Sequence, residues 1–132
     1  FPLRQVFYRA DRLGRPETGL EVCELTPEVG WCEDPNSPDY NCEVTLPPKG
    51  SADDTGMDRM TRDDHVYDLT VIVGYNDTPP MAGKGSAIFM HVARPGFTPT
   101  AGCVALKLED LQKVLKKVDK SSRLIVLPPP GL

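Results

Sequence analysis

Several features that define common protein classes are missing from this sequence. No apolar run reaches the roughly 18 residues of a membrane-spanning helix, and the segment after Phe1 has no apolar core of a signal peptide. The 15 basic residues are outnumbered by 19 acidic ones, which gives a net charge of -4. Aromatic residues are few: 4 Phe, 4 Tyr and 1 Trp. We therefore expect no membrane span and, without a basic excess or a stacking surface, no nucleic-acid partner.

Metal signatures and internal repeats are missing too. The four cysteines, at positions 23, 32, 42 and 103, match no zinc-ligand spacing, so we expect no metal and no cofactor. The 14 prolines and 11 glycines favour many turns. The length of 132 residues is that of one domain, and we expect residues 1–132 to form a single domain.

β-forming residues dominate the segments that are predicted to be regular. Six such runs are predicted strands: Leu3–Arg9, Val22–Leu25, Tyr67–Tyr75, Ser86–Val92, Gly102–Leu106 and Arg123–Leu127. Leucines within Leu108–Val118 recur at helical spacing. Thr26–Gly56 is predicted to be irregular, and Met57–Asp63 to form one or two helical turns. The predicted fold is mainly β with one or two helices, in a closed or sandwiched sheet.

His91 and Cys103 could form a nucleophilic pair. Each alone is more often structural, because a cysteine in an apolar strand acts as a small hydrophobe and a histidine there is a satisfied core residue. One strand–loop–strand connection separates them, so adjacent strands would bring the imidazole within reach of the thiol. Gly102, directly before the cysteine, allows a tight turn that would aim backbone N–H groups at an oxyanion.

The residues around this pair resemble a known enzyme family. The chain reads HVARP from His91 and TAGCVAL from Thr100, which is the pattern H-x-x-R-P…T-x-G-C-V-A-L. This order is similar to the catalytic segment of the YkuD-type L,D-transpeptidases, in a branch common in proteobacteria. These are bacterial cysteine enzymes of the cell wall. The resemblance extends from Phe1 to about Leu127.

The resemblance implies a mixed, mainly β, sandwich-type catalytic domain that acts on peptidoglycan. Cys103 would attack the diaminopimelate carbonyl of a donor stem peptide and release the terminal D-Ala. His91 would act as general base and then acid, oriented by the backbone carbonyl of Val92. N–H groups of Gly102 and Cys103 would hold the oxyanion. An amine of a second stem peptide would then take the acyl group, giving a 3–3 or 1–3 cross-link.

The same resemblance implies an alternative activity, the substrates and inhibitors, and the cellular location. With water as acceptor, the activity would be that of an L,D-carboxypeptidase. Donor and acceptor stem peptides would be the substrates, and carbapenem-type β-lactams would be inhibitors that acylate the cysteine. The location would be the periplasm or cell envelope.

The sequence departs from the family pattern in three places. Family members carry a second histidine and an Arg or Asn around the Gly-Cys pair, whereas this chain has Ala101 and Ala105. The domain is also expected to lack the N-terminal strand that the family places before its counterpart of Phe1. These departures leave open a function of another class, a catalytically impaired module that binds the cell wall. A papain-like protease is disfavoured because its cysteine precedes its histidine.

Eight further residues are predicted to bind the substrate. They come from the catalytic segment, the long irregular stretch and the ends of the predicted central strand: Arg94, Thr100, Trp31, Asp34, Tyr40, Asn41, Tyr67 and Asn76. Arg94 could hold a substrate carboxylate through a bidentate contact, or be a solvated loop residue. Trp31 could instead be packed in the core, and Asp34, before a proline, could be a turn residue. His65 is expected on the surface, with support of the site as the alternative.

Cys23, Cys32 and Cys42 could form one disulfide if the protein is exported, as the resemblance implies. Three pairings are possible, and the sequence alone does not choose among them. The pairing of Cys23 with Cys42 is favoured because Cys32 lies in a Trp-Cys-x-Asp-Pro segment that the family shares. In a reducing compartment all four thiols would be free.

Overall fold

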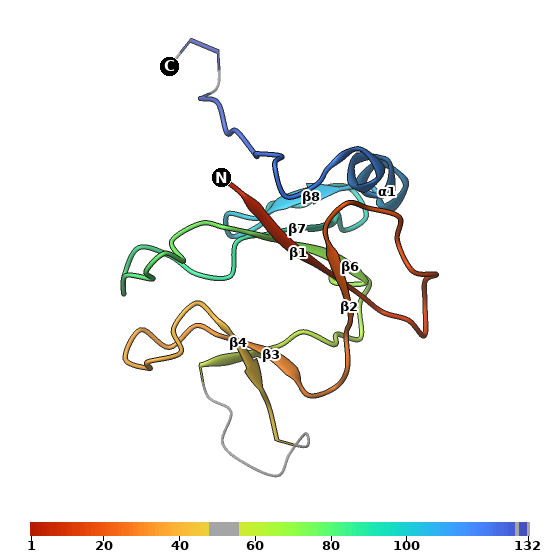
Figure 1. Ribbon diagram of the computed structural model, residues 1–132. Coiled ribbons are helices and arrows are strands. Elements are labelled where there is room, and N and C mark those ends of the chain that lie inside the picture. Colours follow the sequence, from red (N-terminus) through yellow and green to blue (C-terminus); the bar gives the residue numbers. More distant parts are fainter. Residues whose placement is uncertain (48–55, 129, 132) are drawn as a thin grey trace.

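Two β-sheets and one helix make up the fold. The computed structural model describes residues 1–47, 56–128 and 130–131. The elements within these ranges are β1 (Leu3–Tyr8), β2 (Glu21–Glu24), β3 (Val29–Cys32), β4 (Glu43–Thr45), β5 (Met57–Arg59), β6 (Leu69–Val73), β7 (Phe89–Val92), β8 (Val104–Leu106) and α1 (Leu108–Lys117). The larger sheet has the strand order β2-β1-β6-β7-β8, and the smaller sheet has the order β4-β3-β5. Figure 1 shows α1 on one side of the larger sheet and the smaller sheet on the other.

α1 covers one face of the larger sheet because its apolar side chains repeat at helical spacing. Leu111 and Leu115 are almost fully buried in a cluster with Val6, Val71 and Met90. Burial of each leucine side chain stabilises the fold by about 2 kcal/mol. Acidic residues in the first turn and lysines in the last turn complement the helix dipole. The predicted helix is confirmed.

The smaller sheet covers the opposite face of the larger one. Phe7, Ile72 and Phe89 pack there against Trp31 and Met60. The Trp31 ring meets the Phe89 ring edge-on, with 5.2 Å between their centroids. Since both of its faces are covered, β6 is buried at every position, as its continuous apolar run predicts. The mainly β, sandwich-type fold is confirmed.

The predictions for Thr26–Gly56 and Met57–Asp63 were partly wrong. The first stretch contains β3 and β4, with 48–55 outside the described residues, and the second begins with β5 rather than a helical turn. These strands have only three or four residues, too few to show a period-two pattern. Gly30 also interrupts the pattern in β3, where a Cβ would lie 2.5 Å from Cδ1 of Leu46. Leu46, directly after β4, packs over β3 only because this position has no side chain.

Two other predicted strands differ from the structure. Arg123 makes a single bridge to Pro2, and beyond it residues 125–127 are 66–77% exposed, so the predicted closing strand is wrong. The strand predicted from Ser86 begins only at Phe89. Ala87 has a φ of 56°, in the left-handed region, which interrupts the extended backbone there.

All four cysteines are free, so the favoured pairing of Cys23 with Cys42 is not formed. Cys42 instead lies beside Cys32, whose N–H donates to the Cys42 carbonyl at 3.0 Å. Within the described ranges, no helix has the length and apolar character that crossing a membrane requires. In the same ranges, no group of three or more His, Cys, Asp or Glu side chains is arranged to hold a metal ion.

Candidate active site

His91 and Cys103 meet at one cavity between the two sheets. β7 and β8 are parallel neighbours, and their register pairs His91 with Ala105. Extended by one residue, the same register sets Cys103 beside Phe89, whose N–H donates to its Sγ, so the Cys103 side chain shares a sheet face with His91. The cavity of about 250 Å³ that both residues line is completed by Glu33, Asp58, Arg62, Val66, Tyr67, Ser86, Ala87, Arg94, Thr100 and Ala101.

A larger hollow lies elsewhere on the molecule. It measures about 410 Å³, and Arg9, Leu25 and Pro27 are among the residues that line it. Neither a cysteine nor a histidine reaches it. Since convergent reactive groups define an active site better than volume does, the smaller cavity is the candidate.

Backbone groups of the segment before and within β7 hold the Cys103 thiol. Its Sγ–H donates to the Ala87 carbonyl at 3.3 Å, and the Phe89 N–H donates to Sγ at 3.5 Å. Burial raises the pKa of the thiol, the Phe89 N–H lowers it, and the charges of Glu33 and Asp58 raise it further. Cys103 is therefore a thiol at neutral pH in the unliganded protein, and it needs a base to become a nucleophile.

The turn that places Cys103 in the cavity depends on Gly102 and Thr100. Gly102 has a φ of 109°, a conformation that residues with a side chain rarely adopt. The Thr100 hydroxyl donates to the Cys103 carbonyl at 2.6 Å, so it closes the turn. Ala101, where the family has its second histidine, contributes only a methyl group to the cavity.

His91 is held as a neutral base. The residue is 4% exposed, and its Nδ1 lies 3.0 Å from the carbonyl oxygen of Val92. Nδ1–H is therefore assigned as the donor to this carbonyl, which leaves Nε2 as an acceptor. Burial lowers the pKa of the imidazole more than the Val92 carbonyl raises it. This tautomer is the one that can take a proton from a thiol.

Tyr67 forms the aromatic wall beside the histidine. Its ring lies edge-on to the rings of His91 and Phe89, with 5.6 Å between the centroids in both pairs. The Arg62 guanidinium lies 5.2 Å from the centroid of the same ring. Burial, followed by the charge of Cys103, raises the pKa of the Tyr67 hydroxyl. The hydroxyl therefore stays protonated and can donate a hydrogen bond into the cavity.

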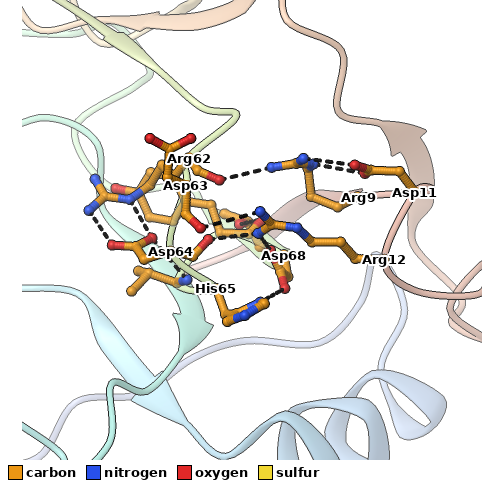
Figure 2. Close-up of polar contacts among 11 residues, drawn as sticks. Arg9, Asp11, Arg12, Arg62, Asp63, Asp64, His65 and Asp68 are labelled. Carbon is orange, nitrogen blue, oxygen red and sulfur yellow. Dashed lines mark hydrogen bonds and ion pairs between the residues drawn. The ribbon is translucent and has the colours of Figure 1, made fainter.

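The loop that carries this wall is anchored to the end of β1, as Figure 2 shows. Arg62 makes a two-point ion pair with Asp64, with N–O distances of 2.9 and 2.8 Å. Arg9 donates to the Arg62 carbonyl at 3.0 Å, and Arg12 donates to the Asp64 carbonyl at 2.7 Å. Arg12 also pairs with the buried Asp68 carboxylate at 2.7 Å. These contacts fix the cavity wall before any substrate binds.

Asn41 lies outside the cavity lining and holds neighbouring segments together. Its buried Oδ1 accepts hydrogen bonds from Trp31 Nε1–H and from the Ala87 N–H, each at 3.0 Å. Its Nδ2 donates to the carbonyls of Tyr75 and Asn76, at 3.0 and 2.8 Å. The amide thus joins three segments, one of which bears the carbonyl that holds the Cys103 thiol.

The predicted substrate residues divide into two groups. Tyr67, Arg94 and Thr100 line the cavity, whereas five others do not: Trp31, Asp34, Tyr40, Asn41 and Asn76. Trp31 and Tyr40 are buried, and Asp34 accepts a hydrogen bond from the Asn36 N–H at 2.9 Å within a turn. The Asn76 amide shapes its own loop through the carbonyls of residues 81 and 85. His65 has a side chain that is 78% exposed, with Nδ1 2.7 Å from Asp68.

Three charged residues of the cavity were not found by sequence reasoning: Glu33, Asp58 and Arg62. Glu33 lies in the Trp-Cys-Glu-Asp-Pro segment, but nothing in the chain distinguishes it from its acidic neighbour. Asp58 falls in the segment that was predicted to be helical. Only the pairing of β5 with β3 brings these two carboxyls together.

The fold and this arrangement agree with the comparison with protein families. Residues 1–126 match the YkuD family, the L,D-transpeptidase catalytic domain, so the chain belongs to this family. Its members are cysteine-dependent L,D-transpeptidases of the cell envelope that act on peptidoglycan peptides. Neither the comparison with curated proteins nor the comparison with solved structures found a match.

Proposed function

We propose that this protein is a peptidoglycan L,D-transpeptidase whose nucleophile is Cys103. The proposal rests chiefly on one observation: a cysteine thiol and a neutral, oriented imidazole line the same cavity on the same sheet face. Membership of the L,D-transpeptidase family supplies the substrate class. The proposed location is the periplasm or cell envelope, where stem peptides are found.

The first half-reaction forms a thioester. His91 Nε2 takes the thiol proton as Sγ of Cys103 attacks the diaminopimelate carbonyl of the donor stem peptide. The carbonyl oxygen becomes an oxyanion, which the N–H groups of Gly102 and Cys103 stabilise. The bond to D-Ala then breaks, and His91 gives its proton to the leaving amine. Free D-Ala and the acyl-enzyme are the products of this step.

The second half-reaction returns the enzyme to its starting state. An amine of an acceptor stem peptide attacks the thioester carbonyl, the C–S bond breaks, and a 3–3 or 1–3 cross-link forms. The Cys103 sulfur recovers a proton from the attacking amine through His91. Arg94, whose side chain makes no ion pair or hydrogen bond within the described ranges, is the proposed partner of a substrate carboxylate. The protonated Tyr67 hydroxyl is a second polar contact.

The experiment is product analysis by mass spectrometry after incubation with a diaminopimelate-type disaccharide tetrapeptide. The proposal predicts dimers that have lost one D-Ala. The Cys103→Ala variant should form none, whereas Cys42→Ala, which removes an exposed thiol, should retain activity. Tripeptide monomer as the sole product would identify an L,D-carboxypeptidase. Binding to sacculi without any product would identify a wall-binding module and overturn the proposal.

A further inference from the structure

The cavity contains a carboxyl pair for which the thioester chemistry above has no use. Asp58 lies on β5, opposite Trp31 of β3, and Glu33 directly follows β3. The Glu33 N–H donates to the Gly56 carbonyl at 2.8 Å, which ties the ends of the two strands together. Both carboxyls therefore belong to the smaller sheet, while Cys103 and its base belong to the larger one. A molecule in the cavity would contact both layers.

The two carboxyls lie close enough to affect each other's ionisation. Asp58 is opposite Trp31 across the sheet, two positions before Glu33, and the Ser86 hydroxyl lies 3.4 Å from Glu33 Oε1. Two neighbouring carboxyls disfavour the state in which both are ionised. Burial, followed by the interaction with Asp58, raises the pKa of Glu33 to about 7. At neutral pH Glu33 is therefore partly protonated, and an incoming cation can replace that proton.

Two further features of the cavity indicate a ligand beside these acids. The first is the nucleophile itself, since Cys103 and His91 line the same cavity as Glu33 and Asp58. The second is the opposite charge in the same cavity, where Arg62 is fixed by its ion pair and Arg94 has no ion pair within the described residues. A cavity with charges of both signs suits an amino acid head group that carries an ammonium and a carboxylate.

We propose that Glu33 and Asp58 bind the ammonium group of the acceptor stem peptide and thereby direct the acyl group to an amine rather than to water. This inference rests on the proposed function. Water carries no charge for the pair to select, whereas a peptide amine arrives protonated at neutral pH. The carboxyl pair thus favours the amine over water as acceptor, a preference that Cys103 and His91 do not themselves provide.

The protons balance in this step. The bound ammonium gives one proton to the carboxylate of Glu33 and becomes a neutral amine. The amine nitrogen then forms a bond to the thioester carbon as the C–S bond breaks. Its second proton passes through His91 to the Cys103 sulfur. The Glu33 proton is lost to solvent when the cross-linked product leaves.

The test compares acylation and acceptor transfer in Glu33→Gln and Asp58→Asn. Acyl-enzyme formation is followed by single-turnover intact mass, and the dimer-to-tripeptide ratio by product mass spectrometry. Loss of a charge-assisted contact predicts that the ratio falls about tenfold or more, while acylation falls far less. Glu28→Gln, an exposed acid outside the cavity, is the matched control and should keep the wild-type ratio.

A second acceptor separates charge recognition from a structural role. Hydroxylamine is uncharged at neutral pH, so both variants should still transfer the acyl group to it. An equal loss of transfer to hydroxylamine, an equal loss of acylation, or an unchanged dimer-to-tripeptide ratio would each overturn the inference. Should one variant fail to fold, the other carries the same comparison. Failure of the proposed function would show separately in the wild-type protein, which would then form no acyl-enzyme or, as an L,D-carboxypeptidase, would form an acyl-enzyme but no dimer.

Discussion

Replacing Asn41 by alanine should both destabilise the protein and disturb its cysteine. The substitution removes the acceptor of two N–H donors, Trp31 Nε1–H and the Ala87 N–H, and both bonds are buried. An unsatisfied buried donor costs about 1–3 kcal/mol, so the two together cost about 2–6 kcal/mol. The carbonyls of Tyr75 and Asn76 are only partly buried and can turn to water. For a domain of this size the melting temperature should fall by roughly 10 °C.

The same substitution should change the reactivity of Cys103, because Ala87 bears the carbonyl that accepts its thiol proton. The assay is thermal unfolding by circular dichroism, together with iodoacetamide labelling of Cys103 followed by peptide mass spectrometry. Asn36→Ala is the matched control, because Asn36 is exposed in the same loop and its side chain makes no hydrogen bond within the described residues. A melting temperature within about 2 °C of wild type, with unchanged labelling, would refute this reasoning.

Three further outcomes follow from the site. Gly102→Ala forces a side chain into a φ of 109° and should cost about 1–3 kcal/mol, measurable as a lower melting temperature; an unchanged value would contradict the turn's role. Because the pKa of His91 is lowered, its base form persists below the ordinary histidine range, and the rate of Cys103 acylation by a carbapenem should fall only at a more acidic pH. A pH–rate midpoint at or above the ordinary value would argue against His91 as the base. Arg12→Ala leaves the buried Asp68 carboxylate without its arginine and should lower the melting temperature by several degrees, whereas a shift under about 1 °C would show that the anchor contributes little.

The central part of the fold could be predicted from the sequence because its signals are local and strong. β6 reads as a continuous β-branched run, and α1 shows helical spacing with charges that match its dipole. His91 and Cys103 could be singled out because their order and spacing suit a strand–loop–strand connection. The structure places them close together, as that spacing indicates, with His91 on β7 and Cys103 directly before the parallel neighbour β8.

The smaller sheet could not be predicted, because tertiary pairing rather than local pattern forms its strands. Three or four residues carry no reliable periodicity, and Gly30 is required by the approach of Leu46, which is sixteen positions away. The acids of the cavity were missed for the same reason, since Glu33 and Asp58 meet only when β3 pairs with β5. Asn41 was predicted to bind substrate, yet its amide is fully used by four protein groups.

The most direct test of the account is to identify the residue that carries the acyl group. The protein is mixed with disaccharide tetrapeptide, quenched in acid within a single turnover and digested for peptide mass spectrometry. We predict a thioester-linked tripeptide adduct on the peptide that contains Cys103, formed together with one equivalent of D-Ala. The adduct should be missing in Cys103→Ala and present in Cys42→Ala. Cross-linked product without any adduct on Cys103, or an adduct on another residue, would contradict the central claim.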